Sequence, residues 1–421
     1  MRRSLSDWLE YIEHLHAQAM ALGLDRVHAV RRHLGVRQPV PVITVGGTNG
    51  KGSTCALIER ILGCAGYRIG LYSSPHLLAY NERVRVGGRP ADDAALCAAF
   101  ERVEQARGGL PLTFFEFGTL AAWEVFQSAA VDGVILEVGL GGRLDAVNAF
   151  EPDCAIVTAV DIDHAEHLGR TREAIGFEKA GIFRCGRPAI VGDAAPPDAL
   201  VAHARAIGAD LQVLGRDFGF DADALQWRFH GRRGRHGGLG HPALRGAVQL
   251  ANASTALAAL DELRDRLPVS MQDVRRGLAE VDLPGRFQVL PGRPTVVLDV
   301  GHNPQAAAVL AGNLGTMGFH PTTWAVFGML RDKDIGAVVE RMKERVDFWL
   351  PAGLEGERGT SEGELAAILA QHGARIHSAF GTPADAFRAA RGLAGENDRI
   401  VAFGSFLTVA DVMRAIAAEQ R

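Results

Sequence analysis

The strongest chemical pattern in the sequence is a glycine-rich stretch followed by a lysine and hydroxyl residues, VITVGGTNGKGST at residues 42–54. An apolar run leads into it and a helical pattern follows it. Glycines let backbone N–H groups approach a phosphate closely, and the first turn of a helix adds unpaired N–H groups and a positive dipole end. We expect Lys51 to reach the β- and γ-phosphates of a nucleotide and Ser53 to approach Mg²⁺.

This stretch departs from the common phosphate-binding pattern GxxxxGK[ST]. Three residues separate Gly46 from Gly50, and Gly52 lies between Lys51 and Ser53. A glycine-rich turn without a ligand is the alternative interpretation. The combination of strand, lysine and helix favours the phosphate site.

Candidate metal ligands follow two other apolar runs. Glu137 ends VILEVG, and Asp161, Asp163 and His164 follow CAIVTAV. Ligands of parallel sheets gather at the carboxyl ends of the strands, and oxygen ligands suit Mg²⁺. The alternatives are a buried acid with a structural partner at Glu137 and a structural imidazole at His164.

Two further segments carry charged groups that could act on a ligand. Lys179 lies in a helical stretch, FEKAG, where a lysine taken alone is expected at the surface. Asp299 and His302 lie in LDVGHNP, at the end of an expected strand. Ligand binding is the general rule there, and an aspartate that stabilises a turn is the alternative. Spacing alone therefore predicts an ATP-dependent enzyme with two α/β domains and leaves the acceptor open.

The elements that must position these residues alternate between strand-like and helix-like patterns. We expect a first helix over residues 7–22, capped by Asp7 and with Ala19 on its apolar face. Expected strands are 40–47, 68–74, 131–139, 154–160, 295–301, 323–328, 347–352 and 399–404, and expected helices are 55–66, 92–106, 120–129, 199–209 and 252–267. This alternation predicts α/β architecture, with a P-loop-type, mainly parallel sheet first and a smaller Rossmann-like domain after it. The Pro/Gly-dense stretch 282–295 is expected to be a linker, and the domains are placed at 1–285 and 286–421.

Composition supports a globular protein and limits its partners. The 421 residues are 47% hydrophobic and 22% charged, with a net charge of −4. That charge gives no reason to expect binding to nucleic acid or to an acidic membrane. The five cysteines form no CxxC pair, and we find neither a signal peptide nor an apolar run of ~18 residues. We therefore expect a cytoplasmic protein without nucleic-acid or membrane partners.

One stretch, residues 215–245, is rich in glycine and arginine. We interpret it as a hairpin and surface loop. A basic patch for nucleic acid is the alternative, but Asp217, Asp221 and Asp223 offset its charge.

Eleven motifs, taken in order, resemble the folylpolyglutamate synthase/dihydrofolate synthase family of Mur-type amide ligases. They are GGTNGKGS, LYSSPHLLAYNERVRV, TFFEFGTLAA, LEVGLGGRLDAVN, DIDHAEHLG, EKAGIF, NAST, LPGRF, LDVGHNP, FGMLRDKD and FGSFLTVADV. The resemblance covers almost the whole chain, and Gly52 in the phosphate loop is typical of this family. Many relatives have DGAHNP where this chain has DVGHNP, which leaves Asp299, His302 and Asn303 in place.

The resemblance assigns roles to individual residues. It implies an ATP site made by Asn49, Gly50, Lys51, Gly52, Ser53, Asn252, Arg286 and Asp299. It implies Mg²⁺ ligands at Ser74, Glu137 and His164, with two ions in all. It also implies that Lys179 is carbamylated and binds the second metal ion, and that His302 lies near the phosphates and the incoming glutamate.

The same resemblance implies a pterin side. Its residues are Leu24, Asp25, Arg26 and Val27, then Thr113, Phe114, Phe115 and Glu116, and finally Leu144, Asp145 and Ala146. Such segments are similar to those of bifunctional bacterial members, so dihydropteroate, reduced folates and L-glutamate are the expected substrates, with ATP and Mg²⁺. A chain that only extends folate tails, or another Mur-type amino-acid ligase, is the alternative. Relatives are usually monomers, so a monomer is expected here.

Overall fold

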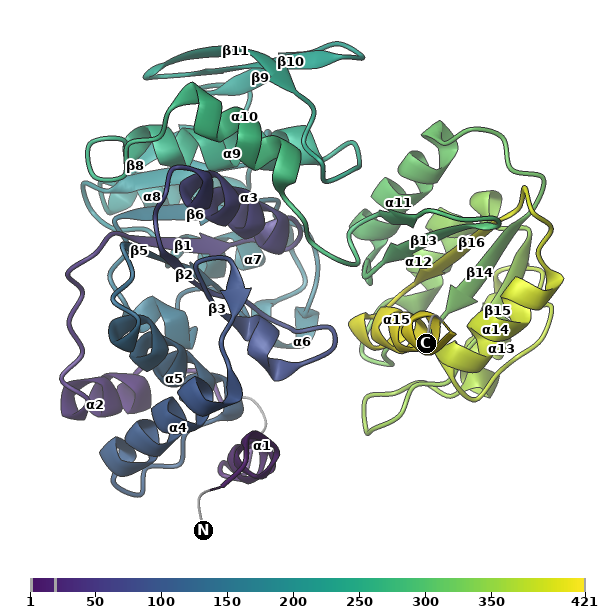
Figure 1. The fold of residues 1–421 in the computed structure, drawn as a ribbon, viewed down its shortest axis with the longest axis horizontal. Helices are drawn as coiled ribbons and strands as arrows, with labels where there is room; N and C mark the ends of the chain where they lie inside the picture. Colours follow the sequence, from purple (N-terminus) through teal and green to yellow (C-terminus); the bar gives the residue numbers. More distant parts are fainter. Residues whose placement is uncertain (1–2, 19–20, 420–421) are drawn as a thin grey trace. The chain divides into compact units, whose positions relative to one another are not determined.

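The computed structural model describes residues 3–18 and 21–419 of the chain. The chain divides into two compact units, which are treated separately below (Figure 1). The first unit comprises Met1–Ala243 and Leu250–Val281, and the second comprises Leu244–Gln249 and Asp282–Arg421. Within the described ranges, no helix is both long and apolar enough to cross a membrane.

The first helix is shorter than the sequence predicted. Helix α1 is Leu5–Glu13, and the chain begins a new helix, α2, at Asp25–His33. Asp7 is not the cap: Ser4 accepts the N–H of Asp7, and the Asp7 carboxylate accepts the N–H of Ser4. This reciprocal capping box fixes the start of α1, and the prediction of one helix over 7–22 is wrong because spacing alone does not reveal its end. Ala19, assigned to that helix, lies outside the described residues.

An eight-stranded sheet forms the centre of the first unit. Its strands are β1 Val42–Gly46, β2 Ile69–Tyr72, β3 Val84–Val86, β4 Arg89–Pro90, β5 Gly133–Glu137, β6 Cys154–Val157, β7 Pro188–Val191 and β8 Asp210–Val213. Their order is β4-β3-β2-β5-β1-β6-β7-β8, and only the pairs β2–β3 and β3–β4 are antiparallel. In the middle, Val45 is paired with Glu137 on one side and with Ile156 on the other. The carboxyl ends of β5, β1 and β6 therefore lie side by side.

Helices cover both faces of this sheet, as buried apolar strands require. Figure 1 shows α3 on one face and α5 on the other. Tyr72, Phe117 and Phe126 belong to the large apolar core on the α5 side. The remaining helical segments of the unit are η1 Tyr80–Arg83, α4 Asp93–Arg107, η2 Ala146–Ala149, α6 Ala165–Leu168, α7 Arg172–Ala180, α8 Asp198–Ala206, α9 Gln249–Glu262 and α10 Met271–Glu280, with α3 at Lys51–Cys64 and α5 at Phe114–Ser128.

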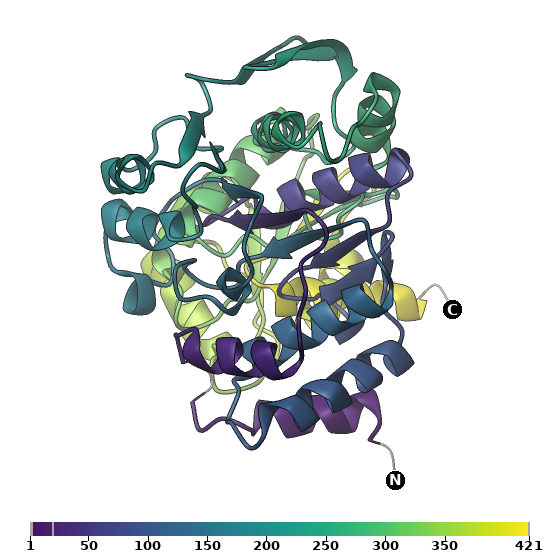
Figure 2. The same ribbon diagram turned by 90° about the vertical axis from the view of Figure 1, so that its left-hand side faces the viewer.

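The glycine- and arginine-rich stretch forms a small antiparallel sheet. Its strands are β9 Gly219–Ala222, β10 Gln226–Gly231 and β11 Gly234–Gly240, so the predicted hairpin is present with one more strand. Figures 1 and 2 show it beside α9 and α10. Arg232 pairs with Asp210, and Arg233 pairs with Glu262. These two arginines are therefore engaged in ion pairs with acidic residues of the protein itself.

The second unit has a five-stranded sheet with the order β12-β13-β16-β14-β15. The strands are β12 Gln288–Leu290, β13 Thr295–Asp299, β14 Thr323–Phe327, β15 Phe348–Pro351 and β16 Arg399–Phe403. Its helical segments are α11 Pro304–Thr316, α12 Ile335–Met342, η3 Lys343–Arg345, α13 Glu362–Gln371, α14 Pro383–Leu393 and α15 Phe406–Glu419. All pairs except β12–β13 are parallel, so the predicted α/β fold class is confirmed. The expected linker over 282–295 is wrong in part, because Gln288–Leu290 pairs with β13 as an edge strand.

Candidate functional site

The glycine-rich loop follows β1, the middle strand of the large sheet, and enters α3. Gly47 has φ 142° and Gly50 has φ 91°, both in the region that favours glycine. A side chain would not fit at either position: a Cβ at Gly47 would lie 1.8 Å from Thr158 Oγ1, and one at Gly50 would lie 2.6 Å from Asn252 Oδ1. The sequence therefore needs glycine at both positions, and the backbone is left open to a ligand.

Two threonines hold this loop against the end of β6. Thr48 donates its backbone N–H to Ala159 O at 2.6 Å and its hydroxyl to Asp161 O at 2.9 Å. The Thr48 hydroxyl also accepts the N–H of Asp161 at 3.0 Å. Thr158 donates its hydroxyl to Asn49 O at 2.7 Å. The loop is thus fixed by bonds from a neighbouring strand.

Two lysines donate to the same backbone oxygen of the loop. Lys51 Nζ lies 3.0 Å from Gly47 O and 3.1 Å from Thr48 O. Lys179 Nζ, on α7, also lies 3.0 Å from Gly47 O. Segments 132 residues apart therefore bring two cations to one turn.

Lys179 is buried, in contrast to the surface position expected for an isolated lysine. Its exposed fraction is 4%. Loss of hydration and the nearby charge of Lys51 lower the pKa of Lys179 from 10.5 to about 7, while Asp163 and Asp145 oppose this shift. Near neutral pH, a substantial share of the side chain is then an uncharged amine.

Ser74 and Glu137, both predicted metal ligands, are in contact. Glu137 ends β5 and is 4% exposed. Its Oε2 accepts the backbone N–H of Ser74, which follows β2, at 3.2 Å. Two neighbouring parallel strands thus bring a carboxylate and a hydroxyl residue to the same edge of the sheet.

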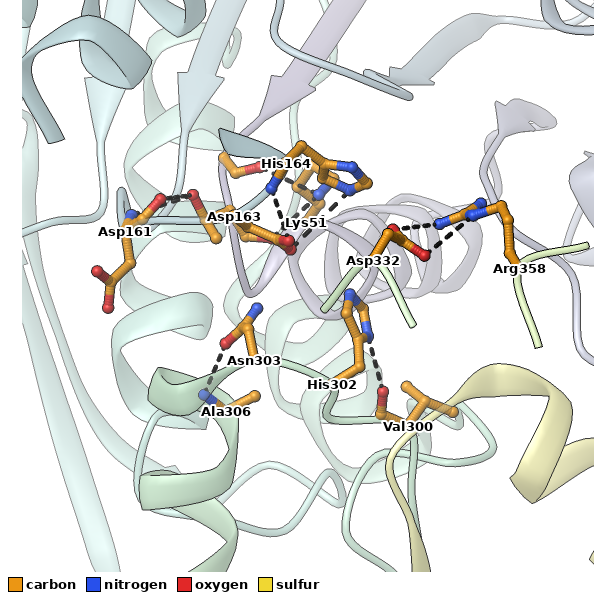
Figure 3. Close-up of polar contacts among 12 residues, drawn as sticks. Lys51, Asp161, Asp163, His164, Val300, His302, Asn303, Ala306, Asp332 and Arg358 are labelled. Carbon is orange, nitrogen blue, oxygen red and sulfur yellow. Dashed lines mark hydrogen bonds and ion pairs between the residues drawn. The ribbon is translucent and has the colours of Figure 1, made fainter. Parts of the chain in front are cut away.

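The segment after β6 carries the predicted imidazole ligand. His164 has φ 50°, an uncommon left-handed conformation, and its N–H donates to Asp163 Oδ1 at 2.8 Å. Its Nε2 lies 3.9 Å from Asp163 Oδ2. Figure 3 shows the side chains of Asp163 and His164 beside that of Lys51. The backbone turn at His164 therefore places this side chain near the glycine loop.

These groups suit a hard divalent cation. Glu137 offers carboxylate oxygen from a buried position, His164 offers imidazole nitrogen, and Ser74 offers a hydroxyl. Across residues 3–18 and 21–419, no three His, Cys, Asp or Glu side chains alone form a group that could hold a metal ion. The predicted ligand set is of a different kind, since it includes a serine and a modified lysine.

The three predicted pterin segments meet in the first unit. Gly23 N–H donates to Leu144 O at 3.3 Å. Arg26 Nη2 lies 2.8 Å from Glu116 Oε1. The structure therefore joins segments that are about 90 and 120 residues apart in sequence.

The charged side chains of Arg26, Glu116 and Asp145 in those segments form hydrogen bonds with other groups of the protein. The Glu116 carboxylate accepts hydrogen bonds from the Arg26 guanidinium and, at 2.8 Å, from the backbone N–H of Thr113 at the start of α5. Asp145 accepts the N–H groups of Leu140 and Val147, and burial raises its pKa to about 7 against these two bonds. Their roles toward a pterin stay predictions.

In the second unit, Asp299 is the last residue of β13, and its carboxylate accepts hydrogen bonds from two backbone N–H groups. Its Oδ1 accepts the N–H of Gly301 at 2.7 Å, and its Oδ2 accepts the N–H of Phe287 at 2.9 Å. Desolvation raises the pKa of Asp299, and these N–H groups, Arg286 and His302 oppose the shift. The turn-stabilising role considered as the alternative is therefore present, and a contact with ATP stays a prediction.

An aromatic ring supports two other predicted residues of this unit. The guanidinium of Arg286 lies 4.9 Å from the ring centre of Phe406, the first residue of α15. The His302 ring lies 6.3 Å from the same ring, and its Nδ1 is 3.0 Å from Val300 O. Asn303 caps α11 through the N–H of Ala306, as Figure 3 shows.

The predicted residues belong to both units. Lys51, Ser53, Asn252 and Lys179 lie in the first unit, while Arg286, Asp299 and His302 lie in the second. Sequence reasoning missed Thr48, Thr158 and Phe406 as supports of the site. Phe406 lies within the motif FGSFLTVADV, so a signal was present, but no residue of that motif was singled out.

Comparison with known proteins identifies the family. Residues 45–192 match the Mur ligase middle domain, and residues 285–406 match the Mur ligase glutamate ligase domain. The chain is 45% identical over 417 residues to the dihydrofolate synthase/folylpolyglutamate synthase of Escherichia coli K12, covering 99% of this chain and 96% of the relative. This chain belongs to the dihydrofolate synthase/folylpolyglutamate synthase family.

Solved structures of this family have the same fold. The E. coli FolC in complex with DHPP and ADP superimposes with a TM-score of 0.94 at 45% identity, over 100% of this chain and 99% of that one. A bifunctional folylpolyglutamate synthase/dihydrofolate synthase with Mn, AMPPNP and L-glutamate bound gives 0.91 at 44% identity, over 99% and 98%. The resemblance inferred from the eleven motifs is confirmed.

Proposed function

We propose that this chain is an ATP-dependent ligase that joins L-glutamate to dihydropteroate, which forms dihydrofolate, and to the γ-carboxylate of reduced folates. The observation that carries the proposal is the loop Gly47–Gly50 with two lysines on one carbonyl, in a chain similar over its full length to bifunctional enzymes. Loop N–H groups and the cation of Lys51 suit a triphosphate.

The reaction needs activation of a carboxylate. A carboxylate repels nucleophiles and has a poor leaving group. Transfer of the γ-phosphoryl group of ATP gives an acyl phosphate and ADP. The amine of glutamate then attacks the acyl carbon and loses a proton, and the tetrahedral intermediate expels inorganic phosphate to leave the amide.

The chain's own task is to position groups and neutralise charge. Lys51 and the N–H groups at the start of α3 are placed to stabilise charge on the transferring phosphoryl group. Ser53 follows in the first turn of α3 and is 3% exposed, so it presents its hydroxyl from a fixed site.

Ser74, Glu137 and His164 would hold the divalent cation, which supplies charge neutralisation for the phosphates. Lys179, if carbamylated, would add an anionic ligand. The low pKa of Lys179 favours that modification, because carbamylation requires an uncharged amine. His302 would lie near the phosphates and the incoming glutamate, and Arg286 would contact ATP.

The acceptor is proposed to bind near the three joined segments, with Phe114, Phe115 and Ala146 among the contacts. Phe115 lies 5.6 Å from Tyr72, ring centre to ring centre, and Ala146 is 4% exposed. Such an apolar lining suits a flat heterocycle.

Three further expectations belong to this proposal. Residues 1–285 and 286–421 are the nucleotide and glutamate ligase domains, and the enzyme acts as a monomer. Its location is the cytoplasm, in accord with five cysteines that are all free thiols.

The deciding experiment measures phosphate release in parallel reactions. Each contains ATP, magnesium and glutamate, with either dihydropteroate or tetrahydrofolate. Glutamate-dependent phosphate with both acceptors is expected. Product from tetrahydrofolate alone would leave only the folylpolyglutamate activity, and a phosphorylated product without free phosphate would indicate a kinase instead.

A further inference from the structure

We propose that Arg172 and Asp193 are positioning residues that hold the segment carrying His164 in place relative to the helix carrying Lys179. The inference rests on the proposed function, because it concerns the same site. Neither residue was singled out by sequence reasoning. Their place in the fold is the first reason to connect them with the site.

Asp193 lies at the functional edge of the large sheet. It follows β7 by two residues, and β7 pairs with β6, the strand that precedes His164. Its side chain is 14% exposed. Its Oδ2 accepts the N–H of Val160 at 3.1 Å, and its Oδ1 accepts the N–H of Ala195 at 3.0 Å. The carboxylate therefore ties the exit of β6 to the exit of β7.

Arg172 binds the other backbone group of the same residue, Val160. It is the first residue of α7, and its Nε donates to Val160 O at 3.0 Å. Its Nη2 donates to Asp193 Oδ2 at 2.8 Å and to Ala195 O at 3.0 Å. Both backbone groups of Val160 are thus bound, one by each side chain of the ion pair. We call Arg172, Asp193 and Val160 the clamp.

The clamp connects two candidate metal ligands. Val160 lies four residues before His164, and Arg172 lies seven residues before Lys179 on one helix, a rise of about 10 Å. Because a helix is stiff over that length, fixing its first residue also fixes Lys179.

Other hydrogen bonds close a ring through the glycine loop. Lys179 donates to Gly47 O, and the hydroxyl of Thr48 bonds to both backbone groups of Asp161, the residue after Val160. The loop, the β6 exit and α7 therefore form one hydrogen-bonded circuit, which the clamp closes at the start of α7. Outer contacts of this kind orient metal ligands and tune affinity.

The chain offers a matched control in Arg102. This arginine also makes three kinds of contact: its Nε donates to Glu124 Oε2, and its Nη2 donates to Glu124 O and Ser128 Oγ. Its side chain is 43% exposed, against 41% for Arg172. It connects α4 to the end of α5, and its three acceptors lie outside the circuit.

The first experiment is hydrogen exchange on the full chain without ligands. Arg172→Ala is expected to speed exchange of the amides of residues 159–165 about tenfold, because two bonds to Val160 are lost or weakened. Arg102→Ala should leave those amides unchanged while lowering the thermal midpoint by a similar amount. Exchange in this segment that is equal in wild type and Arg172→Ala would overturn the proposal.

The second experiment titrates magnesium in the glutamate-dependent phosphate assay. The concentration for half-maximal rate should rise about tenfold in Arg172→Ala and stay unchanged in Arg102→Ala. Equal shifts in both variants would show a general loss of stability and overturn the proposal. If wild type itself forms no amide, the proposed function fails, whereas the exchange comparison still decides the clamp.

A milder variant covers the case in which Arg172→Ala does not fold. Asp193→Asn keeps an oxygen for the Val160 N–H but loses the charge that holds Arg172. It should show the same two changes at about threefold. A folded Asp193→Asn with wild-type exchange at residues 159–165 would also overturn the proposal.

Discussion

The ends of β1 and β13 are both candidate ligand-binding edges, but they are built with opposite chemistry. After β1, two lysines donate to a backbone oxygen, and the residues of the turn include glycines at positive φ. After β13, the carboxylate of Asp299 accepts two backbone N–H groups. The first edge presents the cation of Lys51, a second lysine and open backbone, whereas the second presents a carboxylate that already accepts two backbone hydrogen bonds.

This difference indicates which of the two strand ends could bind a phosphate without rearrangement of its charged side chains. Lys51 bonds to neutral backbone oxygens, and a charged phosphate oxygen could replace them as a stronger partner. Asp299 carries the same sign of charge as a phosphate, so Arg286 is the predicted ATP contact of this edge that could pair with one. Its guanidinium lies 4.9 Å from the centre of the Phe406 ring.

The largest expected effect comes from removing the cation of the first edge. Lys51→Ala should lower glutamate-dependent phosphate release by at least about 10³-fold, since charge on the transferring phosphoryl group loses its fixed partner. The fold should be retained, as judged by circular dichroism. A normal rate would refute the phosphate role of the loop.

The second lysine should matter less than the first if it acts through a metal ion. Lys179→Ala is expected to cost about 10²-fold in rate. Bicarbonate or a short-chain carboxylic acid should restore part of the activity by supplying the missing anion. A fully active Lys179→Ala enzyme would show that the carbamate assignment is wrong.

The burial of Lys179 also predicts a pH effect on stability. Between about pH 7 and 10, the unfolded chain keeps a proton on this lysine that the folded chain has lost, so the free energy of unfolding should rise with pH. In CO₂-free buffer, Lys179→Met should remove a rise of up to about 4 kcal/mol, measured by urea unfolding. Parallel pH curves for the two proteins would contradict the low pKa.

The smallest expected effect lies at the second edge. Phe406→Leu removes the ring beneath Arg286 and should raise the KM for ATP about threefold with little change in kcat. Phe406→Tyr keeps a ring and serves as the control. If both variants behave alike, the ring does not orient Arg286, and the contrast between the two edges is weaker than described.

Much of the fold could be predicted because its strands are short apolar runs with glycine at their ends. β1, β5, β6, β13, β14, β15 and β16 all lie within predicted strands. β7 and β8 were missed although glycines lie on both sides of PAIV and DLQV, because a strand of four residues gives too short a pattern to recognise by its alternation. β12 was hidden by the prolines and glycines around it, which are compatible with an edge strand.

The site was less predictable, because its contacts join distant segments. The strand-end rule singled out Glu137 and the family resemblance singled out Ser74, and the structure shows that the two residues are in contact. No local pattern could show that Lys179 is buried against Gly47, since surface lysines in helices look the same in sequence. The clamp was invisible for the same reason: Asp193 follows a strand that was not predicted.

The order of strands in the eight-stranded sheet also bears on how the ligated substrate could change while ATP remains the proposed energy source. From β1 the chain adds β2, β3, β4 and β5 on one side and then β6, β7 and β8 on the other. The loops that follow β5 and β6 therefore lie on either side of the turn after β1, at the same edge of the sheet. We expect changes in these two loops to alter the acceptor that is ligated, while the turn proposed to bind the nucleotide stays the same.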